Sequence, residues 1–236
     1  MRILALLIFL FSSCFVFSQE TIFKKYNSEI LNEVRDVSIY LPKSYNKDSI
    51  SNFPLAIVLD GHKLFDVYVG VSNYYSYQDN APEQIVVGID MKNTRIKDAG
   101  YDLITSELTP DSKNFYRFLR DEIIPFVEAS YKTSPFLTIV GESLTANFIT
   151  HFLREKYPIF NAYISLNPSL SEDINTQIES YKLSNLSDED NTFYFYMAGN
   201  PYANEKKLAK IKKFATYMKS VDIDNFNVVY DDFSNS

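Results

Sequence analysis

The chain has 236 residues, and its 30 Asp and Glu outnumber its 23 Lys and Arg, giving a formal net charge of −7. This length suits a single α/β domain. The acidic balance repels phosphate backbones and disfavours nucleic acid as a partner. Aromatic residues make up 16% of the chain, so a hydrophobic core can form without disulfides.

The N-terminus has the layout of an export signal. Arg2 precedes an apolar run at 3–11, and small residues at 12–18 offer a cleavage site before Gln19. The apolar run is shorter than the ~20 residues that span a membrane, so no transmembrane segment is expected. We predict a signal peptide at residues 1–18 and an exported domain, periplasmic or secreted, at 19–236. A buried first strand is the alternative.

The single cysteine, Cys14, lies inside this predicted signal. It is an alternative lipidation site, although Phe11 occupies the position where such sites prefer Leu. The mature chain would have no cysteine, which excludes disulfides and a cysteine-based metal site.

Apolar and alternating segments predict strands in alternation with helices. The predicted strands lie at residues 35–41, 55–59, 84–89, 136–140, 162–166, 193–197 and 226–230. Between them we expect a short helix or loop at 62–75, a helix at 112–131 with a kink at Pro125, a helix at 144–157 and a basic helix at 206–218. This order predicts a three-layer α/β fold with a mainly parallel sheet.

The strand at 136–140 runs directly into Gly141, Glu142 and Ser143, and a helical pattern begins at Leu144. A serine on such a strand-to-helix turn has the layout of the nucleophile elbow of α/β-hydrolases. The N–H of the next residue, Leu144, would then face a developing oxyanion. A serine that merely caps the helix is the alternative. Thr145 stands where the motif usually has a second glycine.

A second part of the oxyanion hole is expected after the strand at 55–59, where the chain reads Asp60, Gly61 and His62. In α/β-hydrolases the loop after this strand supplies the second N–H donor, here at His62 or its neighbour. Gly61 allows the backbone to approach a ligand closely. A simple Asp-Gly turn is a compatible alternative.

The catalytic base and acid are poorly defined by the sequence. His151 lies eight residues after Ser143 on the predicted helix, about 12 Å along its axis, so it is expected to pack rather than to serve the serine. His62 as the base would be irregular, because its position usually supplies backbone. Glu205 follows a late strand and is the nearest candidate for the acid, with a helix-start carboxylate as the alternative. The chain shows no phosphate-binding glycine loop and no metal-binding pattern, so we predict no cofactor and no metal.

These residues, in this order, resemble the bacterial esterase family of α/β-hydrolases that includes enterochelin esterases and the esterase-D group. The stretch ending in Ile39-Tyr-Leu-Pro42 and the stretch ending in Leu59-Asp-Gly61 are similar to two family strands. Further similar stretches are 85–89 with Asn93, Arg95 and Asp98, then 118–131, and 160–169.

The resemblance implies hydrolysis of a small-molecule carboxylic ester through an acyl-serine at Ser143. It also implies a histidine in a loop after the last strand, at about Asn235 or beyond Ser236. Glu142 replaces the family's common histidine, and Thr145 and Ala146 replace a Gly-Gly pair. A β-branched Thr145 is expected to crowd the contact between helix and strand.

Two functional hypotheses therefore stand. The first is an exported serine esterase whose sequence as given stops before the histidine loop and last helix. The second is a non-catalytic binding protein that keeps the fold and has lost its base. A weaker third, a role in cell-surface polymer or siderophore handling, rests on export and family analogy alone.

Overall fold

The computed structural model describes residues 20–46, 50–155, 157–179, 181, 183–186, 191–200 and 204–233. The predicted signal peptide, Cys14 and Asn235 lie outside these residues. None of the described helices has the length and apolar character needed to cross a lipid bilayer.

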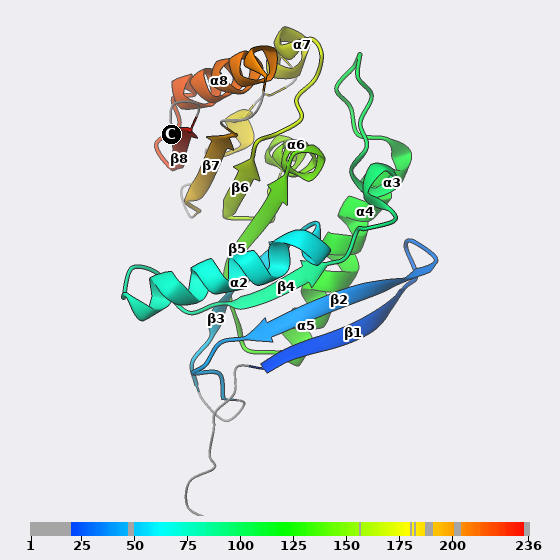
Figure 1. Ribbon diagram of the computed structural model, residues 1–236, viewed down its shortest axis with the longest axis vertical. Coiled ribbons are helices and arrows are strands. Elements are labelled where there is room, and N and C mark those ends of the chain that lie inside the picture. The colour runs from blue at the N-terminus through cyan, green and yellow to red at the C-terminus, as the bar shows by residue number, and fades with distance from the viewer. Residues whose placement is uncertain are drawn as a thin grey trace, which may run out of the picture.

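The described strands form one eight-stranded sheet, with the order β1-β2-β4-β3-β5-β6-β7-β8. Its strands are β1 (Glu20–Ser28), β2 (Glu33–Leu41), β3 (Phe53–Val58), β4 (Ile85–Ile89), β5 (Thr133–Glu142), β6 (Ala162–Leu166), β7 (Phe193–Gly199) and β8 (Phe226–Asp232). All pairs from β4 to β8 are parallel, whereas β1 and β2 join antiparallel at one edge (Figure 1). The predicted α/β fold with a mainly parallel sheet is confirmed.

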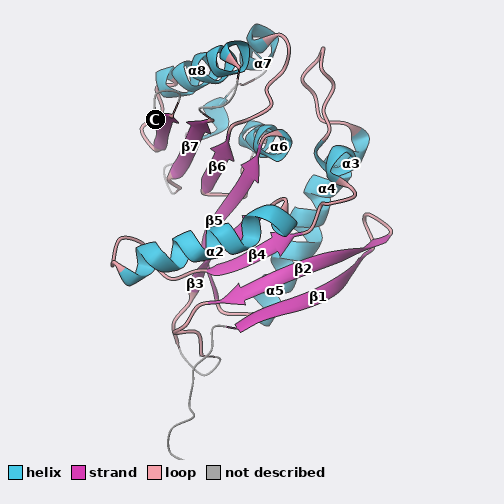
Figure 2. Cartoon of the chain, in the orientation of Figure 1, coloured by secondary structure: helices cyan, strands magenta, loops and turns pink. Residues whose placement is uncertain are grey.

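Strand β1 was not predicted from the sequence. It pairs over its whole length with β2, from Glu20 opposite Leu41 to Ser28 opposite Glu33 (Figure 2). Ile22 and Tyr26 pack against the core, while Phe23 on the other face is 80% exposed. An edge strand of this kind needs only one apolar face, so its sequence looks polar beside the fully apolar central strands.

Helices cover both faces of the sheet (Figure 1). Helix α2 (Gly61–Tyr77) lies across one face and is longer than the short helix or loop that we expected. The other face is covered mainly by α4 (Pro110–Phe118), α5 (Ile124–Ser130), α6 (Leu144–Thr150) and α8 (Glu205–Ser220). Shorter helical segments are α3 (Arg95–Ala99), η1 (Leu119–Ile123), η2 (His151–Arg154), α7 (Ile174–Glu179) and η3 (Leu183–Leu186).

The strands alternate between two hydrophobic cores. In β3, Leu55 and Ile57 face the larger core, while Ala56 and Val58 face the smaller core under α2. All four side chains are fully buried, as a strand covered on both faces requires. Helix α2 covers this face of the sheet as far as β6. On the next strands, β7 and β8, Tyr194 and Val229 are 46% and 51% exposed.

The predicted kink at Pro125 takes the form of a short π-helix. Segment η1 joins α4 to α5, and the N–H of Ile124 donates to the carbonyl of Leu119, five residues earlier. Proline has no N–H to continue the α-helical ladder, so the wider turn just before it adjusts the hydrogen bonding. The helix predicted at 144–157 also differs, because α6 ends at Thr150 and continues as the 3₁₀ turn η2.

Candidate active site

Ser143 lies on a sharp turn between β5 and α6. Its backbone has φ 58° and ψ −107°, a conformation that non-glycine residues rarely adopt. The side chain is half-buried at the end of the strand. Backbone strain of this kind is found at functional sites, where the surrounding structure holds it in place.

Neighbouring backbone holds this turn on three sides. The N–H of Ser143 donates to the carbonyl of Leu166 at 2.8 Å, at the end of β6. The carbonyl of Ser143 accepts from the N–H of Ser169 at 2.8 Å. A Cβ on Gly141 would lie 2.6 Å from the backbone of Thr145, so only a glycine at position 141 lets helix α6 start this close to β5.

A buried carboxylate connects this turn to the next loop of the sheet. Asp60 follows β3, has φ 53° and is 1% exposed. Its carboxylate accepts from Arg95 Nε at 2.8 and 3.0 Å and from Thr145 Oγ1 at 2.8 Å. Since β3 and β5 are adjacent parallel strands, this network ties together the two loops that were predicted to form the site.

The expected crowding by Thr145 is wrong. Its side chain is fully buried, and its hydroxyl accepts from the N–H of Glu142 at 2.9 Å while donating to Asp60. The β-branched side chain therefore supplies two hydrogen bonds in the space where the family pattern has a glycine.

Arg95 also contacts the turn directly, and the helix that carries it is anchored by a buried ion pair between Arg35 and Asp98. Its Nη2 donates to the carbonyl of Glu142 at 2.8 Å, next to Ser143. Helix α3, which carries Arg95, is fixed to β2 because Arg35 donates to both carboxylate oxygens of Asp98 at 2.6 and 2.7 Å. Arg35 and Asp98 are 3% and 1% exposed. A chain of contacts thus runs from β2, the second strand of the sheet, to the elbow.

The candidate oxyanion donors are at the starts of two helices. Leu144 begins α6, and Gly61 and His62 begin α2. The first N–H groups of a helix have no partner within the helix, so they are open to a ligand. A Cβ on Gly61 would lie 3.0 Å from the backbone of Gly88 and Ile89, which explains the glycine. The oxyanion role of these residues stays a prediction.

The ring of His62 is directed away from the elbow. Its Nδ1 lies 3.7 Å from Asp90 Oδ1, and the imidazole is only 17% exposed. Asp90 follows β4, and β3 separates β4 from β5 in the sheet. His62 also lies in the first turn of α2 rather than in the expected loop, so its backbone is better placed than its ring to act at the site.

His151 is a packing residue, as expected. It is 5% exposed, and its Nδ1 accepts from Arg154 Nη1 at 3.2 Å. Burial lowers the pKa of His151 to about 3, with smaller contributions from Arg154 and Lys113, so the ring is neutral at physiological pH.

Glu205 is exposed in the first turn of α8, next to the capping residue Asn204. Asn204 Oδ1 accepts from the N–H of Lys207 at 2.9 Å, so the helix start has a cap without the glutamate. The role of Glu205 as the catalytic acid stays a prediction. Among the described residues, no group of three His, Cys, Asp or Glu is arranged to hold a metal ion.

This geometry can be compared with known proteins. A family model described as "Putative esterase" matches residues 28–223 of the sequence. The chain belongs to this esterase family. The match spans both loops of the candidate site and all strands from β2 to β7. No curated protein matches the sequence of the chain.

Solved structures share the same α/β-hydrolase fold. An uncharacterised protein from Capnocytophaga ochracea is 21% identical with a TM-score of 0.77, and the match covers 91% of this chain but only 59% of that protein. An IroE-like serine hydrolase from Shewanella oneidensis is 22% identical with a TM-score of 0.74, covering 91% and 73%. The BES protein from Bacillus cereus is 18% identical with a TM-score of 0.73, covering 92% and 90%.

The sequence patterns did not predict the network that supports the turn at Ser143. Asp60 was noted as part of the predicted oxyanion loop and of a family-like stretch, and Arg95 as part of another such stretch, but nothing in the sequence pairs residues 35 positions apart. The one available signal was an acidic residue at the end of a fully apolar strand, where a carboxylate needs a buried partner.

The close approach at Gly141 generates a stability prediction. We expect Gly141→Ala to lower the free energy of unfolding by about 3 kcal/mol, because the new methyl group would overlap backbone atoms of Thr145. The matched control is Gly70→Ala, since Gly70 lies within α2 and a methyl group added there would meet no atom within 4 Å. Alanine there should stabilise the protein by about 0.5–1 kcal/mol. Urea unfolding of both variants checks this, and equal effects would contradict it.

Removing the arginine partner of the buried Asp60 carboxylate should be costly. Arg95→Ala leaves the Asp60 carboxylate buried with one remaining side-chain donor, and we expect a loss of about 3 kcal/mol. The control is Arg117→Ala, whose side chain is 54% exposed and 4.0 Å from Asp121, and which should lose less than about 1 kcal/mol. Thermal and urea unfolding measure both, and a small effect for Arg95 would show that the network does not hold the fold.

The hydroxyl of Thr145 has a separate test. Thr145→Val keeps the shape of the side chain but removes the hydrogen bonds to Asp60 and Glu142, and it should destabilise the protein by about 1–3 kcal/mol. Thr145→Ser keeps the hydroxyl and should retain most of the stability. If both variants were equally stable by urea unfolding, the side chain would act through packing alone.

Proposed function

We propose that this chain is an exported serine esterase that hydrolyses a small-molecule carboxylic ester through an acyl-enzyme on Ser143. The observation that carries the proposal is the strained backbone of Ser143, at the strand-to-helix turn of a chain in an esterase family. A serine that served only as the N-cap of the helix would not need this conformation, because N-cap residues ordinarily have extended backbone. The side chain of Ser143 also accepts no N–H of α6.

In the proposed reaction, the Ser143 hydroxyl attacks the ester carbonyl and loses its proton to a base. The negative charge that develops on the carbonyl oxygen is stabilised by the N–H of Leu144 and by the backbone at Gly61 and His62. The alcohol leaves, and water then releases the acid from the serine. The resemblance of the sequence implies that a histidine after β8 acts as the base, and Glu205 is the candidate acid. No cofactor is required.

The buried network suits this role. Asp60 lies at the start of α2 and accepts from Thr145, while Arg95 donates to both Asp60 and the carbonyl of Glu142. The turn of Ser143 and the start of α2 are therefore held in fixed positions relative to each other. Fixed donors lower the barrier because they need no reorganisation when charge develops in the transition state.

A specific observation favours the alternative of a non-catalytic binding protein. The ring of His62 lies near Asp90, with 3.7 Å between Nδ1 and Oδ1, and His151 is buried beside Arg154, so neither histidine of the chain is presented to Ser143. A protein without a base would keep the elbow and could bind an ester or acid without turning it over.

Substitution of the nucleophile separates the two functions. With 4-nitrophenyl acetate as substrate, Ser143→Ala should lower the rate of hydrolysis by about 10³-fold or more if the serine is acylated. The control is Ser220→Ala, at the exposed end of α8, which should leave the rate unchanged. Equal rates for Ser143→Ala and the unmodified chain would reject catalysis by this serine.

Covalent labelling supports the same test. A fluorophosphonate should form an adduct on the peptide that contains Ser143, detected by mass spectrometry, and no adduct should form on the alanine variant. Export is tested separately, because cleavage before Gln19 in the native host gives an N-terminal residue that sequencing identifies.

A further inference from the structure

A cavity of about 230 Å³ opens beside the elbow, between the loop after β6 and the start of α8. Pro168 and Ser169 form part of its wall, and the N–H of Ser169 donates to the carbonyl of Ser143. A residue of the cavity wall is therefore hydrogen-bonded directly to the backbone of the proposed nucleophile. A larger cavity of about 470 Å³ surrounds His151 and Arg154 and does not include the elbow.

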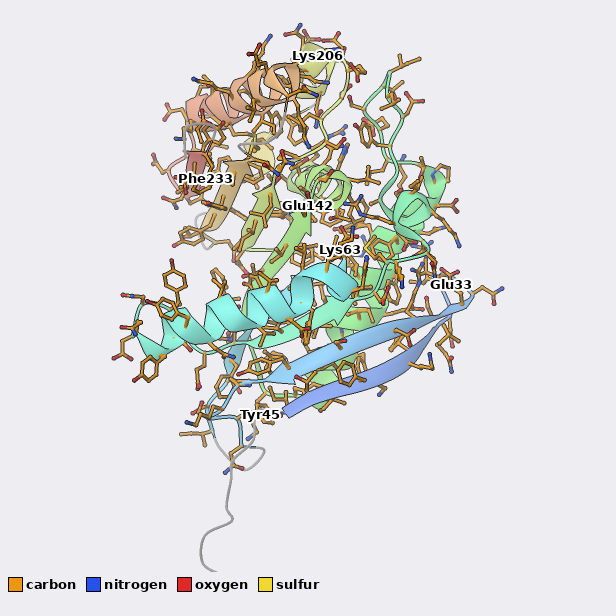
Figure 3. All side chains as sticks on the ribbon, viewed as in Figure 1. Glu33, Tyr45, Lys63, Glu142, Lys206 and Phe233 are labelled. Carbon is orange, nitrogen blue, oxygen red and sulfur yellow. The ribbon has the colours of Figure 1, made fainter. Side chains whose placement is uncertain are left out.

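The opposite wall is unusually basic for an acidic protein. Lys206, Lys207 and Lys210 line the cavity, and the one carboxylate among its described lining residues is Glu172 (Lys206 is labelled in Figure 3). The N-terminus of α8 lies in the same wall and adds its partial positive charge. An excess of positive charge here, in a chain of net charge −7, favours a negatively charged ligand.

Two of the three lysine ammonium groups in this wall already have partners. Lys206 and Lys210 lie 3.2 and 3.6 Å from the same oxygen of Glu172. Lys210 also donates to the carbonyl of Ser171 at 3.0 Å. These contacts use the lysines to fix the loop after β6 onto α8.

The ammonium of Lys207 is different. Within the described part of the chain, no hydrogen-bond acceptor and no carboxylate within 4 Å pairs with its Nζ. Burial lowers the pKa of Lys207, and the charge of Glu142 partly opposes this. The carboxylate of Glu142, a residue labelled in Figure 3, lies 3.6 Å from Arg95 Nη2, so it already has a cationic partner.

We propose that Lys207 binds a carboxylate carried by the ester substrate, so that the enzyme prefers anionic esters over neutral ones. The inference rests on the proposed function, because it assumes that the ester carbonyl sits at Ser143. A half-buried ammonium without a partner gains most from a carboxylate, since charge-assisted hydrogen bonds are about twice as strong as neutral ones. Tyr101, whose hydroxyl donates to the carbonyl of Ser169 at 2.9 Å, would border the same ligand.

The test uses binding, so that it does not depend on turnover. In the full chain with Ser143→Ala, isothermal titration calorimetry compares 4-acetoxybenzoate with its neutral methyl ester. We expect the anion to bind about tenfold more tightly at low salt. Adding Lys207→Gln should abolish this preference, whereas Lys207→Arg should keep most of it because the charge remains.

The matched control is Lys212→Gln, on the exposed side of the same helix and outside the cavity. It makes the same charge change and should leave the preference intact. Equal affinity for the two ligands, or a preference that survives Lys207→Gln, would overturn the inference. If the preference depends on Lys207 but the unmodified chain hydrolyses neither ester, the anion site stands and the proposed esterase function fails. If the unmodified chain clearly hydrolyses the esters but shows no preference for the anion, the esterase function stands and the anion site fails.

Discussion

The buried carboxylate of Asp60 is the interaction on which the candidate site depends. A carboxylate that is 1% exposed is stable only if hydrogen bonds and an opposite charge replace its water. Arg95 and Thr145 supply these, and each comes from a different element. Satisfying one charge therefore fixes the end of β3, helix α3 and the first turn of α6 relative to each other. The more remote pair of Arg35 and Asp98 extends this constraint to the antiparallel edge of the sheet.

The same constraint explains why strained backbone persists at two adjacent strand ends. Asp60 and Ser143 both have positive φ, and neither is a glycine. Such conformations cost about 1–3 kcal/mol each and need a surrounding structure that holds them. Here the hydrogen bonds of Asp60 and the close packing above Gly141 do so. The result is a half-buried serine at the start of α6, next to the strand end that leads into α2, and this is the arrangement from which we propose acyl transfer.

The positions of the two histidines bear on the choice between the esterase and binding hypotheses. The ring of His62 lies 3.7 Å from the carboxylate of Asp90, on the far side of β3 from the elbow, and His151 is kept neutral by burial. The elbow and its support are thus complete within the described residues, whereas the proton acceptor is supplied by neither histidine. The basic cavity at Lys207 is compatible with both hypotheses, since an anion site beside Ser143 would serve a substrate or a bound acid equally.

The sequence by itself determined the architecture and the position of the elbow. Fully apolar runs, such as 55–59 and 85–89, can lie only in strands covered on both faces, and Gly141 before Ser143 marks a helix packed tightly on a strand. Only the tertiary structure decided what the polar side chains do. The edge strand β1, the partner of Asp60, the direction of the His62 ring and the environment of the Lys207 ammonium, which has no partner among the described residues, all depend on contacts between residues far apart in the chain. Local patterns report periodicity and burial, whereas the pairing of charges is set by which loops the folded sheet brings together.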